Sequence, residues 1–197
     1  MKLFTSHRSV LALMLAAAML ATRQIDPGVL PDASWAVFFL GGFILGSRYL
    51  FALFMALAVA VDYIATQHLG VSSYCLSRAY LFVLPAYATL WWGGYRSARH
   101  WQRAESLRSC ARLGITLVAA VSLCFLISNA SFYWLGGRVA APHLAGWLAN
   151  FRQWYGYFLA VPCAYVALAA GAYALLRKWG VRWADRALPA EARAPRP

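Results

Sequence analysis

Residues 35–61 read WAVFFLGGFILGSRYLFALFMALAVAV, and this apolar run decides how many times the chain crosses a membrane. As one continuous helix it would place Arg48 near the middle of the bilayer, where a charged side chain costs about 2.5–3.5 kcal/mol on insertion scales. A turn at Gly46-Ser47-Arg48 avoids that cost and divides the run into two helices. The sequence therefore predicts two spans in this region.

The rest of the chain has the same apolar character. Of its 197 residues, 62% are hydrophobic and 12% are charged, which is far from the composition of a soluble domain. Crossing a hydrocarbon core of about 30 Å takes roughly 20 helical residues. Runs that approach this length begin near Ser9, Asp32, Arg48, Arg78, Leu113 and Trp154.

These runs predict an all-α integral membrane protein, a bundle of six transmembrane helices. Residues 1–187 are expected to form a single transmembrane domain. Residues 188–197, LPAEARAPRP, are rich in Pro and Ala and have little to bury, so we expect a disordered tail.

The basic residues predict the orientation, because Lys and Arg are enriched at the cytoplasmic ends of membrane helices. With both termini cytoplasmic, fourteen of the 18 basic residues fall in inner segments, and four face outward: Arg23, Arg78, Arg138 and Arg152. Fusing the second and third spans would instead put the arginine-rich loop after the fourth span outside. Membrane orientation thus explains the net charge of +12, and we expect no nucleic-acid partner, because the charges form no stripe.

The first span has an alternative reading. MKLFTSHRSVLALMLAAAML combines a basic start with a short apolar stretch, which also describes a secretory signal peptide. A cut after Ala18 satisfies the small-residue pattern of such a site, whereas a cut after Ala21 puts Met19 at the −3 position. A retained first helix is the main expectation.

One cysteine lies in an outer segment of this topology. Cys75 is the centre of LGVSSYCLSRAY, residues 69–80, whereas the other three cysteines fall inside spans or on the cytoplasmic side. Outer cysteines normally occur in disulfide pairs, and Cys75 has no outer partner. It either fills a gap at the end of the fourth span, links two chains, or serves as a reactive thiol.

The neighbours of Cys75 favour a reactive thiol. They are polar or cationic and favour the thiolate form: Ser72, Ser73, Tyr74 and Arg78. A thiolate is a soft ligand for metal centres, but the sequence has no C-x-x-C, H-x-x-H or H-E-x-x-H motif to complete a site. A single thiolate suits a metal that arrives already chelated and needs one axial ligand.

Two features resemble a known family. Ala12-x-x-x-Ala16 in the first span would let another helix approach closely, and with six helices and about 200 residues it resembles the S-components of energy-coupling-factor (ECF) vitamin transporters. The outer cysteine in SSYCLSRAY is similar to that of the BtuM family, the solitary cobalamin-transporting S-components of Gram-negative bacteria.

This resemblance implies cobalamin (vitamin B12) uptake across the bacterial inner membrane, with Cys75 as the axial cobalt ligand on the periplasmic side. It also implies cysteine-dependent decyanation of cyanocobalamin. Either a coupling module, consisting of a transmembrane protein and ATPases, docks at Ala12 and Ala16, or the protein transports the vitamin alone. The chain itself contains no Walker A motif.

A corrinoid site should combine aromatic surface with hydrogen-bonding groups. The expected ligand contacts, besides Ser72, Ser73 and Arg78 near the cysteine, are Tyr74, Tyr80, Tyr133 and Arg138. The alternative for the aromatic residues is an interfacial belt, since Trp and Tyr concentrate at both membrane surfaces. Asp62 is the one acid within an apolar run, so it should face the interior and be paired. It either fixes the following loop or accepts a hydrogen bond from the ligand.

Three other functions fit the same features. The first is an S-component for another vitamin, which would be indifferent to Cys75. The second is a membrane thiol oxidoreductase using Cys75, although no resolving cysteine lies nearby in the sequence. The third is a non-catalytic assembly subunit whose outer loops bind a protein.

Overall fold

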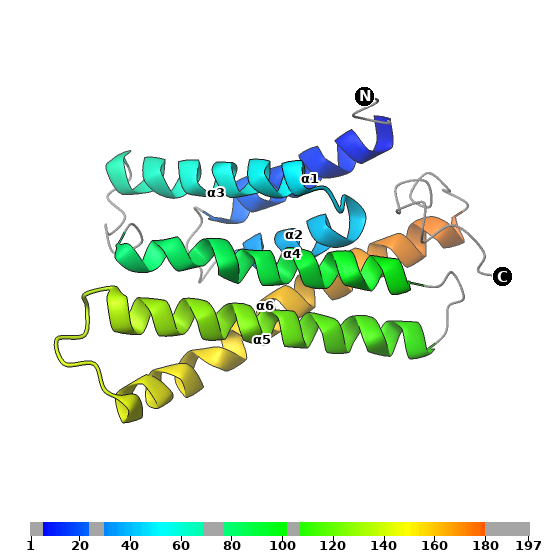
Figure 1. The fold of residues 1–197 in the computed structure, drawn as a ribbon. Coiled ribbons are helices and arrows are strands. Elements are labelled where there is room, and N and C mark those ends of the chain that lie inside the picture. Colours follow the sequence, from blue (N-terminus) through cyan, green and yellow to red (C-terminus); the bar gives the residue numbers. More distant parts are fainter. Residues whose placement is uncertain (1–5, 24–29, 69–76, 102–106, 180–197) are drawn as a thin grey trace.

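The computed structural model describes residues 6–23, 30–68, 77–101 and 107–179, and every regular element in these ranges is helical (Figure 1). The expected all-α fold is therefore confirmed. The helices are α1 (Ser6–Arg23), α2 (Ser34–Ile44), α3 (Arg48–His68), the 3-10 helix η2 (Arg78–Phe82), α4 (Val83–His100), α5 (Leu107–Leu135) and α6 (Leu144–Lys178).

Three of these helices are long and apolar enough to cross a membrane. They are α3 with 21 residues, α5 with 29, and 33 residues of α6, which is what an integral membrane protein requires. α1 and α4 have 18 residues each and carry basic residues in their last turns. α2 has only 11 residues. At 1.5 Å per residue it is about 16 Å long, so it cannot cross the hydrocarbon core alone.

The turn predicted within residues 35–61 is present. α2 ends at Ile44 and α3 begins at Arg48. Gly46 has φ +58°, a left-handed conformation that glycine adopts readily, and its N–H donates to the carbonyl of Gly41. The glycine thus closes the end of α2, and Arg48 starts the next helix instead of lying in the middle of one long span.

α2 occupies the centre of the molecule. Eight of its 11 residues are buried, and it packs most extensively against α4. A Cβ added to Gly42 would overlap the carbonyl oxygen of Trp91, and one added to Gly94 would overlap that of Phe39. Each backbone therefore lies directly against the other at a glycine pair, Gly41-Gly42 in α2 and Gly93-Gly94 in α4. Small residues permit this close approach.

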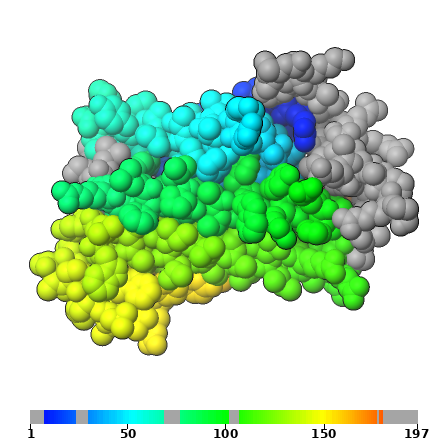
Figure 2. Space-filling view, viewed as in Figure 1, coloured from blue at the N-terminus to red at the C-terminus, as the bar shows by residue number. Residues whose placement is uncertain are grey.

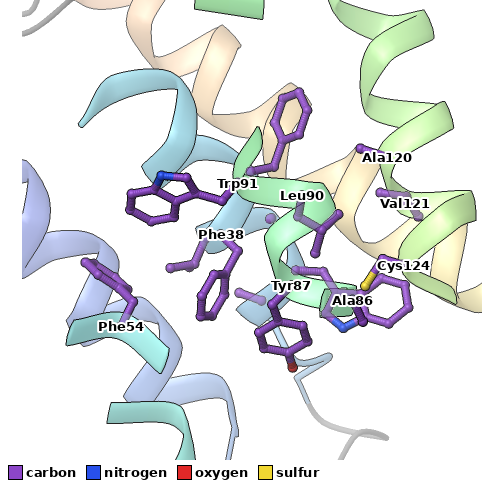
Figure 3. Packing of buried hydrophobic residues seen from close by; sticks show 14 of the residues in the cluster. Phe38, Phe54, Ala86, Tyr87, Leu90, Trp91, Ala120, Val121 and Cys124 are labelled. Carbon is purple, nitrogen blue, oxygen red and sulfur yellow. The ribbon is translucent and has the colours of Figure 1, made fainter. Parts of the chain in front are cut away.

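Aromatic side chains fill the space around this crossing. Phe38 lies between Phe54 of α3 and the side chains of Tyr87 and Trp91 of α4, with ring centroids 4.5–6.3 Å apart (Figure 3). Beyond α4, the core continues to α5 through buried apolar side chains such as Val121. The helices thus share one continuous core with α2 in the middle.

The helices do not all extend equally far. The described chain begins and ends near the same end of the bundle, and α1 and α2 stop short of the opposite end, which α3, α4, α5 and α6 reach (Figure 1). α4 and α5 lie side by side on the face shown in Figure 2. Exposed apolar side chains cover the helices, Leu13, Ile115 and Leu168 among them, as expected for a surface in contact with lipid.

Candidate functional site

A buried ion pair joins α1 to α3 where α1 ends. Arg23, the last residue of α1, donates from Nε to Oδ1 of Asp62 and from Nη2 to Oδ2, both at 2.6 Å. The Arg23 and Asp62 side chains are only 9% and 15% exposed. Two parallel charge-assisted hydrogen bonds hold the guanidinium and carboxylate in one plane, the strongest geometry for such a pair. Asp62 is therefore paired and faces the interior, as expected for an acid in an apolar run.

The remaining donor group of Arg23 extends this pair to two more helices. Nη1 donates to Ser34 Oγ of α2 at 2.7 Å and to the Tyr87 hydroxyl of α4 at 3.3 Å. It also lies 3.7 Å from Oδ2 of Asp32, a side chain that is 43% exposed. The Arg23 guanidinium thus connects α1 to three other helices. Its N–H donors have acceptors, so the free-energy cost of burying them without hydrogen bonds is avoided.

Tyr80 links the same cluster to the connection between α3 and α4. It lies in η2, and its hydroxyl donates to Oδ2 of Asp62 at 2.7 Å. Asp32 secures α2 in a similar way, because its Oδ1 accepts from both the N–H and the hydroxyl of Ser34. We call Arg23, Asp32, Ser34, Asp62, Tyr80 and Tyr87 the arginine cluster.

The position of the arginine cluster follows from the ends of the helices. The first connection, residues 24–29, lies outside the described ranges; it directly follows Arg23 and ends shortly before Ser34. The second connection, residues 69–76, follows His68, which is about 1.7 helical turns after Asp62, and precedes Ser77, which is close to Tyr80 in the sequence. The cluster therefore fixes the described chain on both sides of each of these two connections.

The predicted cysteine site lies in the second connection. Ser72, Ser73, Tyr74 and Cys75 are outside the described residues. Of their predicted neighbours, Tyr80 contacts Asp62, and Arg78 is exposed at the first residue of η2. The structure thus brings together two of the predicted ligand contacts, Asp62 and Tyr80.

Tyr133 and Arg138 belong to a second group, at the connection between α5 and α6. The Tyr133 hydroxyl donates to the backbone carbonyl of His143 at 3.3 Å, which ties the end of α5 to the start of α6. Arg138 is exposed directly after Gly137, whose φ of +77° turns the chain. This connection lies at the bundle end where α3 ends and α4 begins (Figure 1).

The alanine face of α1 differs from the sequence expectation. Ala12 and Ala16 are partly buried and pack against the protein's own core, whereas Leu13, Ala17 and Ala21 are exposed. The reason is the rotation of the helix: the same face carries Met19 and Thr22, which are buried against α2 and α3. The exposed surface of α1 is therefore offset by one residue from the A-x-x-x-A pair.

The three described cysteines do not gather at the arginine cluster. Cys124 is buried in the core of α5, Cys163 is partly buried in α6, and Cys110 is exposed near the start of α5, at the opposite end. Within residues 6–23, 30–68, 77–101 and 107–179, no group of three or more His, Cys, Asp or Glu side chains is close enough to hold a metal ion.

An apolar groove of about 420 Å³ runs between α1, α2 and α6. Its walls are almost entirely hydrocarbon, for example Leu15, Phe39 and Val166, with the rings of Tyr165 and Tyr173. The Tyr165 hydroxyl is already used, because it donates to the carbonyl of Pro31 at 2.7 Å. A ligand with many amide groups would find few partners in this groove, so it does not fit the predicted vitamin site.

Sequence reasoning missed most of the arginine cluster. From the sequence, Arg23 is one of four outward-facing basic residues, and no pattern distinguishes Ser34 or Tyr87. The available signal was that Asp62, the one acid within an apolar run, and Arg23 lie near the same predicted membrane face. An acid in an apolar span requires a partner, and Arg23 is one of the four basic residues that the sequence places on that side.

The arginine cluster is built to hold geometry. Both oxygens of Asp62 and all three nitrogens of the Arg23 guanidinium are engaged with protein groups. A carboxylate held in this way is a poor nucleophile or base, because reaction would leave the buried guanidinium without its counter-charge.

No protein-family model matches the chain, and no curated protein matches its sequence.

Proposed function

We propose that this protein is a bacterial inner-membrane transport protein of the S-component type, with both termini cytoplasmic. In this proposal it binds cobalamin at the bundle end that contains the arginine cluster, with the Cys75 thiolate as the axial cobalt ligand. The observation that carries the proposal is the bond from Tyr80 to the Arg23–Asp62 pair, which fixes the chain on both sides of the connection containing Cys75.

Coordination by one residue needs this kind of support. A single thiolate provides one bond to a chelated metal, so its affinity depends on how little freedom the connection loses when the ligand binds. Asp62 and Tyr80 lie 18 residues apart in sequence and are joined by a 2.7 Å hydrogen bond, which limits the span that the connection can adopt. Asp62 then acts as a positioning residue, the first of its two predicted roles.

The charge near the connection also favours a thiolate. Arg78 is exposed three residues after Cys75, and no acid intervenes between them in the sequence. A neighbouring cation lowers the cost of ionising a thiol, and the thiolate is the form that binds metals. In this proposal Tyr133 and Arg138, which belong to the connection between α5 and α6, contact the amide groups at the rim of a corrinoid.

The proposed chemistry is a ligand exchange at cobalt. The Cys75 sulfur donates an electron pair to form the Co–S bond and displaces the lower nitrogen base. Its donation weakens the bond to an upper cyanide, which leaves with the Co–C electron pair, so the oxidation state of cobalt does not change. The cofactor supplies this reactivity, and the protein tunes it through one axial ligand.

Energy for transport would come from a coupling module of a transmembrane protein and ATPases, because the sequence has no Walker A motif. We place its docking surface on the exposed face of α1, which contains Leu13, Ala17 and Ala21. This surface replaces the face through Ala12 and Ala16, which packs against the protein's own core.

The visible absorption spectrum of the purified protein with cyanocobalamin tests the proposal. Wild-type protein should shift the spectrum of the bound corrinoid, and Cys75→Ser should bind more weakly with no shift. Cys110→Ser is the matched control, because this exposed thiol lies at the opposite end of the bundle, and it should behave as wild type.

An unchanged shift in Cys75→Ser would refute coordination by this residue. Copurification of a flavin, thiamin or biotin with the wild-type protein, unaffected by Cys75→Ser, would instead assign the fold to a different vitamin. A trapped mixed disulfide between Cys75 and a partner protein, without corrinoid binding, would favour the thiol oxidoreductase.

A further inference from the structure

A cationic cleft lies between α4 and α5, at the bundle end opposite the arginine cluster. Its volume is about 540 Å³, and Arg96, His100 and Arg112 line it together with three hydroxyl-bearing side chains. We propose that this cleft binds the phosphate of an anionic phospholipid in the leaflet that surrounds this end of the bundle. The proposal does not depend on the transport function or on Cys75.

The charge of the cleft is not neutralised by the described protein. In the described part of the chain the acidic side chains are Asp32 and Asp62, and both belong to the arginine cluster. Arg96 and Arg112 therefore line the cleft without an acid from these ranges beside them. Guanidinium groups match the oxygens of phosphate well, and basic pockets between membrane helices recognise anionic headgroups.

An aromatic ring orients one of the two arginines of the cleft. The Arg96 guanidinium lies over the ring of Trp92, 5.0 Å from the centroid, so Trp92 holds it in place.

The apolar part of the cleft favours a lipid over a soluble anion. Trp92 and Ile115 line it and are 61% and 69% exposed, respectively. Both lie closer to the middle of their helices than the basic residues do: Trp92 precedes Arg96 and His100 in α4, and Ile115 follows Arg112 in α5. A headgroup bound at the arginines would thus place its acyl chains along these side chains, in the direction of the bilayer interior.

Native mass spectrometry of the detergent-solubilised protein tests this proposal. We expect wild-type protein to retain phosphatidylglycerol at least about tenfold more tightly than phosphatidylcholine, because the two arginines attract a headgroup with net negative charge more than a zwitterionic headgroup whose choline cation they repel. Arg96→Gln/Arg112→Gln should remove this preference. Arg48→Gln is the matched control, because Arg48 also lies over an aromatic ring, that of Tyr49 at 5.1 Å, but outside the cleft.

Three results would overturn the proposal. The first is equal retention of the two lipids by wild-type protein, which needs no variant and so does not depend on variant folding. The second is an equal loss of preference in Arg48→Gln, which would indicate general attraction to a basic protein. The third is displacement of the lipid by millimolar inorganic phosphate or glycerol phosphate, which would assign the cleft to a soluble anion.

Discussion

At the scale of single residues, the decisive feature is the Arg23 guanidinium of α1, which forms hydrogen bonds to α2, α3 and α4. An Arg or an Asp alone in an apolar environment is costly, so each of Arg23 and Asp62 stabilises the buried state of the other. Ser34 and Tyr87 then accept the remaining Arg23 donors, and Tyr80 donates to the Asp62 carboxylate. The loss of stability when one side chain of the arginine cluster is removed therefore depends on which buried charge or hydrogen-bonding group is left without a partner.

Asp62→Asn should strongly destabilise the protein. It leaves the buried Arg23 without its counter-charge, a loss of about 3–5 kcal/mol for a buried pair broken on one side. Thermal unfolding in detergent should show a clearly lower midpoint. Asp32→Asn is the control, since Asp32 is 43% exposed and 3.7 Å away, and its effect should be small. The double variant Arg23→Gln/Asp62→Asn should regain part of the lost stability, because no buried charge remains unpaired. Equal unfolding midpoints for Asp62→Asn and wild type would contradict the buried Arg23–Asp62 pair.

Tyr80→Phe should separate positioning from folding. The change removes one hydrogen bond to a carboxylate, which is worth about 1.5–3 kcal/mol, but leaves the ring in place. We expect modest destabilisation and weaker binding of cobalamin, while the spectral shift from Cys75 persists at saturation. Tyr49→Phe, an exposed tyrosine at the other end, should change neither property. Loss of the shift at saturating ligand would show that Tyr80 does more than position the connection.

At the scale of elements, α2 is exceptional because it is short, central and almost entirely buried. Its sequence is apolar on all sides, which is typical of a helix surrounded by protein or lipid. The close crossing with α4 explains the two glycine pairs, because any Cβ at Gly42 or Gly94 would overlap the opposite backbone. The packing of these two helices consequently depends on residues with no side chain.

Gly42→Ala and Gly94→Ala should each separate α2 from α4 and lower stability by about 1–3 kcal/mol or more, as over-packing of a tight core does. Gly114→Ala is the matched control, because it lies within α5 and its Cβ would meet nothing within 4 Å. Since alanine favours helix over glycine by about 1 kcal/mol, that control should be neutral or stabilising. Folded yield and unfolding midpoint in detergent measure all three; a stable Gly42→Ala variant would disprove the close crossing.

At the scale of the whole molecule, the two ends of the bundle have different chemistry. One end holds the arginine cluster, in which acids and a base are paired. The opposite end holds Arg8, Arg48, Arg96, Arg99 and Arg112, and several of these arginines lie over aromatic rings or near helix ends, as Arg8 does at the carbonyl of Ile44. Such an asymmetry orients a membrane protein, since basic ends stay on the cytoplasmic side.

Single-cysteine variants test this orientation. A membrane-impermeant thiol reagent added to intact cells should label a protein that retains only Cys75. A protein that retains only Cys110, which is exposed at the arginine-rich end, should react only after the cells are opened. The reverse pattern would invert the proposed topology and place the predicted cobalamin site on the wrong side.

Bulky substitutions on α1 test the proposed docking surface. Ala17→Trp/Ala21→Trp changes only exposed positions, so it should abolish vitamin uptake in cells while binding by the purified protein persists. Ala12→Trp/Ala16→Trp should instead lower the unfolding midpoint, because these residues pack against the core. Undiminished uptake in Ala17→Trp/Ala21→Trp would show that the exposed face only contacts lipid.

The sequence by itself determined the features that depend on the free-energy cost of placing a single residue or a short run in an apolar environment. Hydrophobic runs predicted helical segments, although α2 is too short to be the full span expected there, and the cost of burying Arg48 predicted the turn that Gly46 makes. The same reasoning predicted that Asp62 would be paired, because an acid in an apolar span has no inexpensive alternative.

Only the tertiary structure decided which residues meet. Arg23 and Asp62 are 39 positions apart, and Tyr80 a further 18, so their contact depends on how α1 and α3 are packed and rotated. The shortness of α2, the glycine crossing and the inward rotation of Ala12 and Ala16 have the same origin. Each depends on the relative placement of helices, and hydropathy along a chain contains no information about that placement, since lipid and protein interior are equally apolar.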